Sequence, residues 1–447
     1  MRAEAKRTKW TSRVKGPFFV LFVVFAFPLF PPNFELSIKE TGAAKAAELT
    51  VAAKTSRELS REEKWRGDLM FLFAELPKRH KNLYFKITRE KFDREIAKII
   101  ESIPRLTDLE IILALRRVTT MIGDPHTRIP HVREKVFPIL LYQFPDGVFA
   151  TAATEEYKDT LDAKLVKIGE TSIERAIEEV RPYIPVENEW WFKQQFPYFL
   201  TDPEILYGLK ILPSADTGDF TFIDRKGKTF VVKLNSVSTD EEIRFIHPFD
   251  TQGGQTPLYM RNQGEYYWRE YLADSKTIYI NYRRCADMPS YSFFRFAASV
   301  LKIIDENPVE RVVIDLRQNG GGNSTIIMPL LAALAKRRFG SQPGKLFVLI
   351  GRGTFSSAFL NALKLKRDLN AILVGEPTGQ RPNAYGEVKT MNLPHSDLPV
   401  QYSTRYLKTM EDDPPALEPD IQVTRSSLDY ASGRDPVLER ALSYKGK

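Results

Sequence analysis

Residues 311–325 read RVVIDLRQNGGGNST, a β-branched apolar run that ends in charged residues and three consecutive glycines. A short apolar run bounded by such a turn signal predicts a buried strand. Gly320–Gly322 predict a loop whose backbone closely approaches another group, because glycine tolerates positive φ. Residues 326–336 predict a helix directly after the loop. Together these elements turn backbone N–H groups toward one point, which suits an anion or a developing oxyanion.

Two nucleotide-binding loops fit this stretch poorly. A dinucleotide fingerprint needs its third glycine where the chain has Thr325, and a Walker loop needs a lysine that Asn323–Thr325 does not supply. A phosphate site is therefore a weak interpretation of the glycines. A purely structural tight turn stays an alternative at this point.

The glycine stretch lies within an alternation of predicted strands and helices. This alternation favours a mostly parallel sheet with ligands at the carboxyl ends of its strands. Ser356, in GRGTFSS (351–357), falls at such an end, and its hydroxyl is either a nucleophile or a helix cap. We predict strands at 277–282, 312–316, 345–350 and 371–374, and helices at 290–304, 326–336 and 355–365.

The rest of the chain divides by pattern. The first segment combines basic residues with a short apolar run, which predicts a signal peptide or a retained membrane anchor. A helical region follows, in which Thr107 and Glu110 form a capping box, and Pro125 should place His126 in the loop after that helix. Short apolar runs, with a hairpin about Lys226–Gly227, then predict a β-rich region. The predicted regions are 1–35, 36–135, 136–250 and 251–447.

Composition excludes several classes of function. The chain has 447 residues, 43% hydrophobic and 27% charged, which is ordinary for a globular protein of two or three domains. Its net charge of +8 follows no basic stripe interleaved with aromatic residues, so we expect no nucleic-acid partner. Cys285 is the only cysteine, which leaves no intrachain disulfide and no cysteine-based metal site. The five histidines include no pair at i, i+4, and we expect no metal.

Five motifs in order resemble the tail-specific or C-terminal processing serine peptidases, a family that includes tricorn protease and the non-peptidase interphotoreceptor retinoid-binding protein. The resemblance is close from about residue 277 to 423 and looser around His126. It implies a ClpP/crotonase-like α/β peptidase core, with an N-terminal helical region and a β-rich, divergent PDZ-like middle domain. The motifs are MIGDPHT (121–127), VVIDLRQNGGGNS (312–324), GRGTFSSAFLNAL (351–363), ILVGEPTGQRPNAYGE (372–387) and LEPDIQV (417–423).

The resemblance implies hydrolysis of peptide bonds through an acyl-enzyme, without a cofactor. Ser356 matches the nucleophile, with Ser357 as the second choice. Members of the Ser-Lys type carry a lysine shortly after the GEPT turn, where this chain has Gly379-Gln380-Arg381. Arginine keeps its proton near neutral pH and cannot serve as the base. Lys389 lies too far along an extended segment to replace it.

We therefore expect the tricorn-like arrangement, in which a histidine is the base and a carboxylate orients it. His126 matches the histidine, and Glu411 matches the carboxylate, with Asp412 and Glu387 as alternatives. The backbone N–H groups expected in the oxyanion hole are those of Gly321 or Gly322 and of Ser357.

The expected partner is a protein or peptide substrate, and the sequence gives no oligomeric state. The leader predicts an exported protein, periplasmic, extracellular or anchored to the outer side of a membrane. The competing hypothesis is a catalytically inactive family member that binds a peptide or a hydrophobic ligand. For that hypothesis the aromatic cluster at 190–199 offers a surface, although such clusters more often pack between domains.

Overall fold

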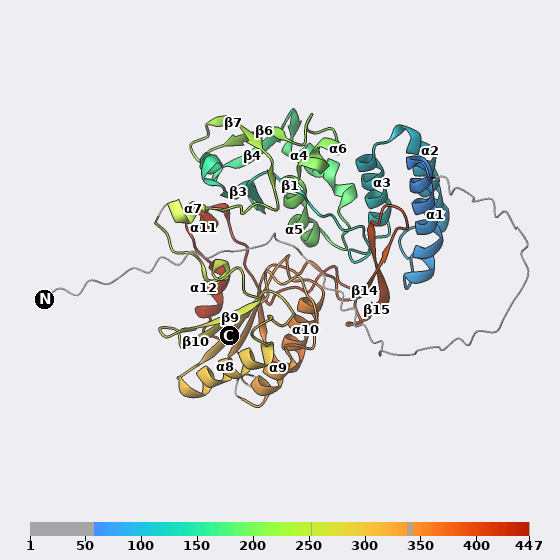
Figure 1. The fold of residues 1–447 in the computed structure, drawn as a ribbon. Coiled ribbons are helices and arrows are strands. Elements are labelled where there is room, and N and C mark those ends of the chain that lie inside the picture. Colours follow the sequence, from blue (N-terminus) through green and yellow to red (C-terminus); the bar gives the residue numbers. More distant parts are fainter. Residues whose placement is uncertain (1–57, 252, 338, 340–341, 343, 447) are drawn as a thin grey trace, which may run out of the picture.

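A computed structural model describes residues 58–251, 253–337, 339, 342 and 344–446. The predicted leader, 1–35, lies outside the described residues. Within them, no helix combines the length and apolar character needed to cross a membrane. The described chain forms a helical N-terminal region, a β-rich middle region and an α/β region, which Figure 1 shows in blue, green and yellow to red.

The predicted α/β alternation forms a six-stranded sheet in the order β16-β13-β12-β11-β10-β9. Its strands are parallel except β9, which pairs antiparallel with β10 at one edge. The prediction of a mostly parallel sheet is thus confirmed. The strands are β9 (Tyr267–Leu272), β10 (Thr277–Tyr282), β11 (Arg311–Asp315), β12 (Leu346–Ile350), β13 (Ile372–Gly375) and β16 (Ile421–Gln422); the helices between them are α8 (Phe293–Glu306), α9 (Met328–Ala335) and α10 (Ser357–Leu369).

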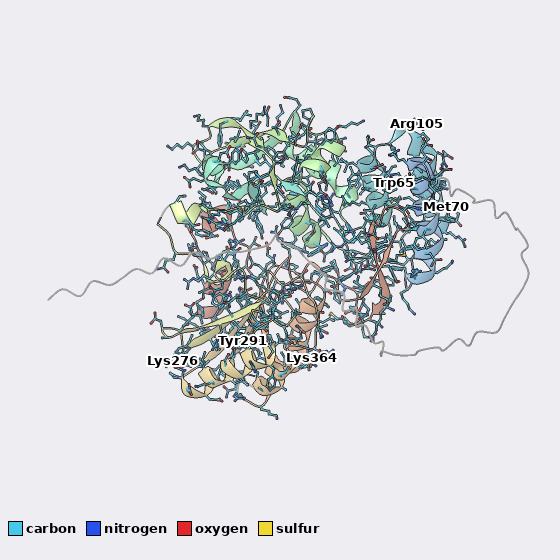
Figure 2. All side chains as sticks on the ribbon, viewed as in Figure 1. Trp65, Met70, Arg105, Lys276, Tyr291 and Lys364 are labelled. Carbon is cyan, nitrogen blue, oxygen red and sulfur yellow. The ribbon has the colours of Figure 1, made fainter. Side chains whose placement is uncertain are left out.

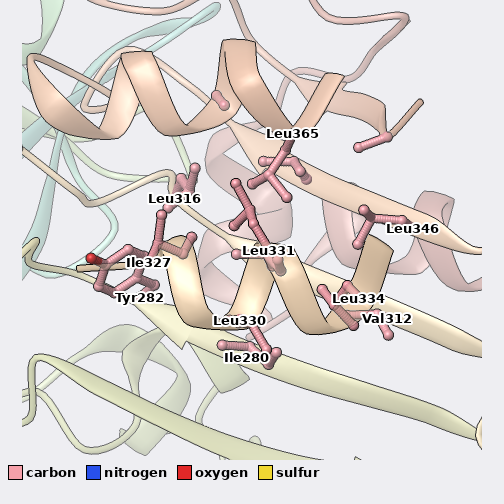
Figure 3. Close-up of a cluster of buried hydrophobic side chains, with 14 of the residues drawn as sticks. Ile280, Tyr282, Val312, Leu316, Ile327, Leu330, Leu331, Leu334, Leu346 and Leu365 are labelled. Carbon is pink, nitrogen blue, oxygen red and sulfur yellow. The ribbon is translucent and has the colours of Figure 1, made fainter. Parts of the chain in front are cut away.

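Helices cover both faces of this sheet because alternate strand residues point to opposite sides. Ile280 and Val312 share a buried cluster with α9 and α10, and Figure 3 shows Ile280 beside Leu330 and Val312 beside Leu334. On the other face, Tyr279, Val313 and Phe347 pack with the C-terminal helix α12 (Pro436–Leu442). The carboxyl ends of the strands stay uncovered by these helices, so the loops that follow the strands can form a site.

The N-terminal helices are α1 (Arg61–Arg79), α2 (Arg89–Ser102) and α3 (Asp108–Thr120). The predicted capping box at Thr107 and Glu110 is present and fixes the start of α3. Trp65 and Met70 lie on α1 (Figure 2), where Trp65 is buried and donates a hydrogen bond to Asp108 at 2.8 Å, while Met70 is exposed.

The middle region contains an antiparallel sheet in the order β2-β3-β4-β6-β7, with β5 added to β4. The predicted hairpin about Lys226–Gly227 joins β6 and β7. Its strands and helices are β2 (Ile139–Phe144), β3 (Gly147–Ala153), β4 (Lys164–Ile168), β5 (Thr171–Ser172), α4 (Ile173–Val180), α5 (Glu189–Phe199), α6 (Pro203–Gly208), β6 (Thr217–Ile223) and β7 (Thr229–Asn235); β1 (Lys135–Val136) pairs with β8 (Val237–Ser238), and α7 (Pro248–Thr251) follows.

The α/β region is not self-contained. Between β13 and β16 the chain forms a two-stranded ribbon, β14 (Ala384–Asn392) and β15 (Pro399–Leu407), which packs against the N-terminal helices (Figure 1). Met391, Val400 and Tyr402 of the ribbon belong to the same buried cluster as α1, α2 and α3. A second crossing is made by α11 (Ser427–Ala431), whose Tyr430 packs against the middle region. Sequence periodicity does not show these crossings, because it reports local structure alone.

A buried ion network joins the end of β11 to the start of α12. Arg317 contacts Asp315 at 2.6 Å and Asp435 at 2.8 Å, and all three side chains are at most 12% exposed. Burial alone would raise the pKa of Asp435, but the charge and hydrogen bonds of Arg317 lower it below its usual range. Arg317 is therefore the ion-pair partner that these two carboxylates share.

We predict that Arg317→Met lowers the free energy of unfolding by about 3–5 kcal/mol, because it leaves two buried carboxylates without their ion-pair partner. The urea midpoint of the first unfolding transition measures the loss. Lys408→Met is the matched control, since it breaks an exposed pair with Glu411 and should leave the midpoint unchanged. Equal shifts for both variants would contradict the prediction.

Candidate active site

Ser356 lies where the loop after β12 becomes α10. Its backbone has φ 52° and ψ −126°, a conformation that a residue with a side chain rarely adopts. The N–H of Ser356 donates to Oε1 of Gln380 at 2.6 Å, which holds this backbone in place. The side chain makes no capping hydrogen bond to α10. The capping interpretation of Ser356 is therefore wrong, and its hydroxyl is free to face the site.

His126 lies in the loop after α3, as the sequence predicts. The N–H of Thr127 bonds the carbonyl of Asp124 at 3.0 Å, which closes a turn with Pro125 at its second position. This turn places Nε2 of His126 3.3 Å from Oγ of Ser356, although the two residues are 230 positions apart. Its ring stacks on Phe355, with 4.8 Å between centroids.

Asp124 is fully buried and fixes the histidine loop. One oxygen accepts the N–H of His126 at 2.9 Å, and the other accepts Oγ1 of Thr127 at 2.6 Å. Nε2 of His80, from the end of α1, lies 3.2 Å from that second oxygen. Burial alone would raise the pKa of Asp124, but its hydrogen bonds to His126 and His80 outweigh burial and hold it well below its usual range.

His80 donates to Asp124 through Nε2. Its Nδ1 accepts the N–H of Asn82 at 3.0 Å, so Nδ1 is unprotonated and the proton of a neutral ring lies on Nε2. On the other side of the carboxylate, Nδ1 of His126 lies 3.6 Å from Asp124 and has no hydrogen-bond partner among the described residues. Among the described residues, the carboxylate with a recorded contact to Nδ1 of His126 is therefore that of Asp124.

The structure does not bring the expected acids to His126. The side chain of Glu411 is 94% exposed and pairs with Lys408 at 2.8 Å. Asp412 and Glu387 are exposed as well. The reason is that residues 411–413 lie on the surface, with Asp413 paired to Arg381 at 2.7 Å. The position of Glu411 before the PDI motif thus does not carry it into the site, whereas a carboxylate oxygen of Asp124 lies 3.6 Å from Nδ1 of His126.

The glycine loop lies directly against Ser356. Gly321 and Gly322 have φ of 107° and 133°, which confirms the predicted need for glycine. A Cβ on Gly321 would lie 2.7 Å from Cβ of Ser356, so the two backbones nearly touch.

The loop does not offer all its N–H groups to a ligand. The N–H of Gly321 is taken by Oδ1 of Asn319 at 2.9 Å, which removes Gly321 from the expected oxyanion donors. The N–H groups of Gly322 and Ser357 have no acceptor among the described residues. The hydroxyl of Ser357 donates to the carbonyl of Gly322 at 2.5 Å, so Ser357 is poorly suited to be the nucleophile.

Other nucleophiles and bases lie in unsuitable surroundings. Burial raises the pKa of the Cys285 thiol to about 11, despite hydrogen bonds that lower it, so the thiol stays protonated near neutral pH. Lys389 is exposed on β14. After the GEPT turn, Gln380 holds the backbone of Ser356 and Arg381 pairs with Asp413. No lysine therefore takes the place of the base in this part of the described chain.

Sequence reasoning missed two residues of the site, Asp124 and His80, and named Trp191 only as part of the aromatic cluster at 190–199. Asp124 stands two positions before His126, and Asp-Pro-X-Thr is a turn pattern that could have drawn attention to it. Trp191, from α5, stacks on Phe355 with 4.1 Å between ring centroids, and Phe355 stacks on His126 on its own account. Elsewhere in the aromatic cluster, Phe192 and Phe196 are buried in the core of the middle region, whereas Tyr198 is exposed. His80 carries no sequence signal, since a lone histidine at a helix end is common.

The geometry defines the class of the site. A serine on a strained strand-to-helix junction, a histidine nitrogen beside its hydroxyl, and free N–H groups next to it form the set that serine hydrolases use for acyl transfer. The site lies at the carboxyl ends of the parallel strands, where ligand sites of such sheets occur.

A family model agrees with this class. Residues 279–423 match the family model described as peptidase family S41. Mature CPAF complexed with lactacystin is 12% identical over 85% of this chain and 98% of that chain, with a TM-score of 0.58, which shows a shared fold. The photosystem II D1 C-terminal processing protease is 14% identical over 85% and 99% of the two chains, with a TM-score of 0.41. Tricorn protease is 12% identical over 85% of this chain and 36% of that chain, with a TM-score of 0.41.

None of the curated protein sequences matches the chain significantly. The chain therefore contains, at 279–423, a domain that matches peptidase family S41, the family of the tail-specific and C-terminal processing peptidases. It is thus a hydrolase of the serine peptidase type. The histidine loop lies outside the matched residues.

We predict that Gly321→Ala lowers the free energy of unfolding by about 1–3 kcal/mol, because the new methyl group would overlap Ser356. Gly320→Ala is the matched control, since a Cβ there meets nothing within 4 Å. Urea unfolding of both variants measures the difference. A Gly321→Ala protein as stable as Gly320→Ala would show that the close approach to Ser356 is not real.

Proposed function

We propose that the chain hydrolyses peptide bonds in proteins or peptides through an acyl-enzyme, with Ser356 as nucleophile and His126 as general base. The observation that carries the proposal is the 3.3 Å contact between Nε2 of His126 and Oγ of Ser356. In place of the expected Glu411, Asp124 is the carboxylate that positions His126. The mechanism is thus of the Ser-His type with an acid from the histidine loop itself.

The reaction follows from these positions. Oγ of Ser356 attacks the peptide carbonyl carbon while Nε2 of His126 takes the hydroxyl proton. The negative charge that develops on the carbonyl oxygen is met by the N–H groups of Gly322 and Ser357. His126 then gives its proton to the leaving amine, and the acyl-enzyme forms. A water molecule, deprotonated by His126, attacks the ester and releases Ser356.

Asp124 supports this cycle by its charge and its hydrogen bonds. Because its pKa lies well below the usual range, it is an anion throughout the pH range in which the base acts, and it stabilises the imidazolium that forms. His80 and Thr127 hold the second carboxylate oxygen. We assign His80 a positioning role, since it acts on His126 through Asp124.

We predict that a fluorophosphonate probe labels Ser356, because the reaction requires an activated serine and no metal. Intact-mass measurement after labelling should show one adduct on the wild-type chain and none on Ser356→Ala. His126→Ala should lower the labelling rate about 10²–10⁴-fold. Peptide mapping locates the adduct.

Two further variants serve as controls. Ser357→Ala keeps the backbone N–H and should still be labelled. Glu411→Gln should be labelled at the wild-type rate, because its side chain lies on the surface. If the folded wild-type chain takes no label while a known serine peptidase does, the chain is instead a binding member of the family. If Glu411→Gln is labelled more slowly than the wild-type chain, Glu411 and not Asp124 is the orienting acid.

We predict that Asp124→Asn lowers kcat/KM for a peptide substrate about 10²-fold, since the amide supplies no countercharge to His126. His80→Phe keeps an aromatic ring against Phe85 and Tyr385 but donates no hydrogen bond. It should lower kcat about 10–100-fold through misplacement of the base.

The split between kinetic constants separates positioning from loss of structure. Both variants should change kcat and leave KM near the wild-type value, and His80→Gln, which keeps an N–H donor, should recover part of the activity. A His80→Phe protein with wild-type kcat would contradict the role of His80.

Export is part of the proposed function and rests on the predicted leader, 1–35. The test is fractionation of cells that produce the full chain. Recovery of the protein outside the cytoplasm would support export. Retention of the full chain inside the cytoplasm would overturn it.

A further inference from the structure

Three potential metal ligands converge outside the proposed active site. The nearest ligand atoms of His131, Asp202 and Glu204 all lie within 4.8 Å of one another. His131 follows the histidine loop, and the two carboxylates flank Pro203 at the start of α6. The proposed reaction uses none of these groups.

Asp202 and His131 are already held in place. Oδ1 of Asp202 accepts the N–H of Ile205 at 3.0 Å, as the cap of α6, which leaves Oδ2 directed at Nε2 of His131. The side chain of Asp202 is 1% exposed and that of His131 is 15% exposed. The pair is thus preorganised, and His131 gives the cluster access to solvent.

Glu204 distinguishes this cluster from an ordinary His–Asp pair. Its carboxylate has no hydrogen bond or ion pair with any residue that the structure describes, although it is half-buried. The cluster thus sets two carboxylates against one imidazole, and no recorded ion pair among the described residues neutralises Glu204. A bound cation would supply that missing charge.

Arg116 is a buried cation in the same region, but it does not pair with these carboxylates. Its Nη2 donates to the carbonyl of Pro130 at 3.4 Å, and its Nε and Nη1 have no partner among the described residues. Its contribution to the cluster is therefore long-range.

We propose that His131, Asp202 and Glu204 bind a divalent first-row transition cation, with Zn²⁺ preferred. One imidazole and two carboxylates form a ligand set that suits Zn²⁺ and Mn²⁺. Mg²⁺ prefers oxygen ligands with near-ideal octahedral geometry and is the weaker candidate. Three protein ligands leave coordination positions for water.

The bound cation would fasten the histidine loop to the middle region. His131 lies five residues after His126, and between them the backbone of Arg128 pairs with Gln401 of β15. The segment from His126 to His131 is thus held by the ribbon on one side. The metal would hold its other end to α6, so it would stabilise the segment without entering the active site.

The test is a titration of the EDTA-treated full chain, without a histidine tag, by isothermal calorimetry with ZnCl₂, MnCl₂ and MgCl₂. We expect saturable binding of about one Zn²⁺ per chain, weaker binding of Mn²⁺, and no heat with Mg²⁺. Glu204→Gln and His131→Gln should each weaken Zn²⁺ binding by about tenfold or more.

Two variants serve as controls for the location of the ion. Glu134→Gln changes an exposed carboxylate three residues after His131 and should leave the affinity within about twofold. His126→Ala should also keep its affinity, which would separate this site from the proposed active site. Because Glu204 has no recorded partner, Glu204→Gln should melt at the wild-type temperature without metal, so lost binding cannot be attributed to misfolding.

Two results would overturn the proposal. One is the absence of saturable Zn²⁺ binding to the wild-type chain, and the other is binding that Glu204→Gln and His131→Gln leave unchanged. Neither result depends on peptidase activity, so the metal site and the proposed function can fail independently.

Discussion

The buried carboxylate of Asp124 is the constraint on which the site depends. An unpaired carboxylate in this position would cost several kcal/mol, so its two oxygens need donors. They find them in the backbone of His126, the hydroxyl of Thr127 and the ring of His80. Two donors come from the histidine loop itself and the third from the end of α1, so the carboxylate ties the loop to that helix. The place of His126 beside Ser356 is a consequence of this hydrogen bonding.

The site is assembled from parts that fold in different regions. The α/β region provides the strained serine and the glycine loop, while the N-terminal helical region provides His126 and His80. The β14–β15 ribbon connects them, because it leaves the central sheet and packs among the N-terminal helices. The middle region contributes Trp191 through its contact with Phe355. The geometry of the serine and histidine is therefore a property of the whole described chain.

Sequence reasoning was strongest where chemistry is local. The strand and helix pattern from 277 to 375, the positive φ of Gly321 and Gly322, and the loop position of His126 all follow from side chains acting on their own backbone. The choice of Ser356 over Ser357 agrees with the hydrogen bond of Ser357 to Gly322.

Tertiary contacts were beyond the same reasoning. Glu411 matches the expected acid only by its order in the chain, and order does not show that its loop lies on the surface. Asp124 is part of the GDPHT motif, but the sequence does not show that it is buried, because the burial depends on packing by α1 and the ribbon. His80 lies 44 residues before Asp124 and reaches it through packing that no periodicity encodes.

The ribbon also has a consequence for biosynthesis. During translation the N-terminal helices leave the ribosome long before residues 384–407, yet their buried cluster includes Met391, Val400 and Tyr402. A nascent chain that ends before the ribbon lacks part of that cluster, and its histidine loop lacks the pairing with Gln401. Most of the polypeptide must therefore be made before His126 and Ser356 can meet, so an unfinished chain would lack the proposed active site.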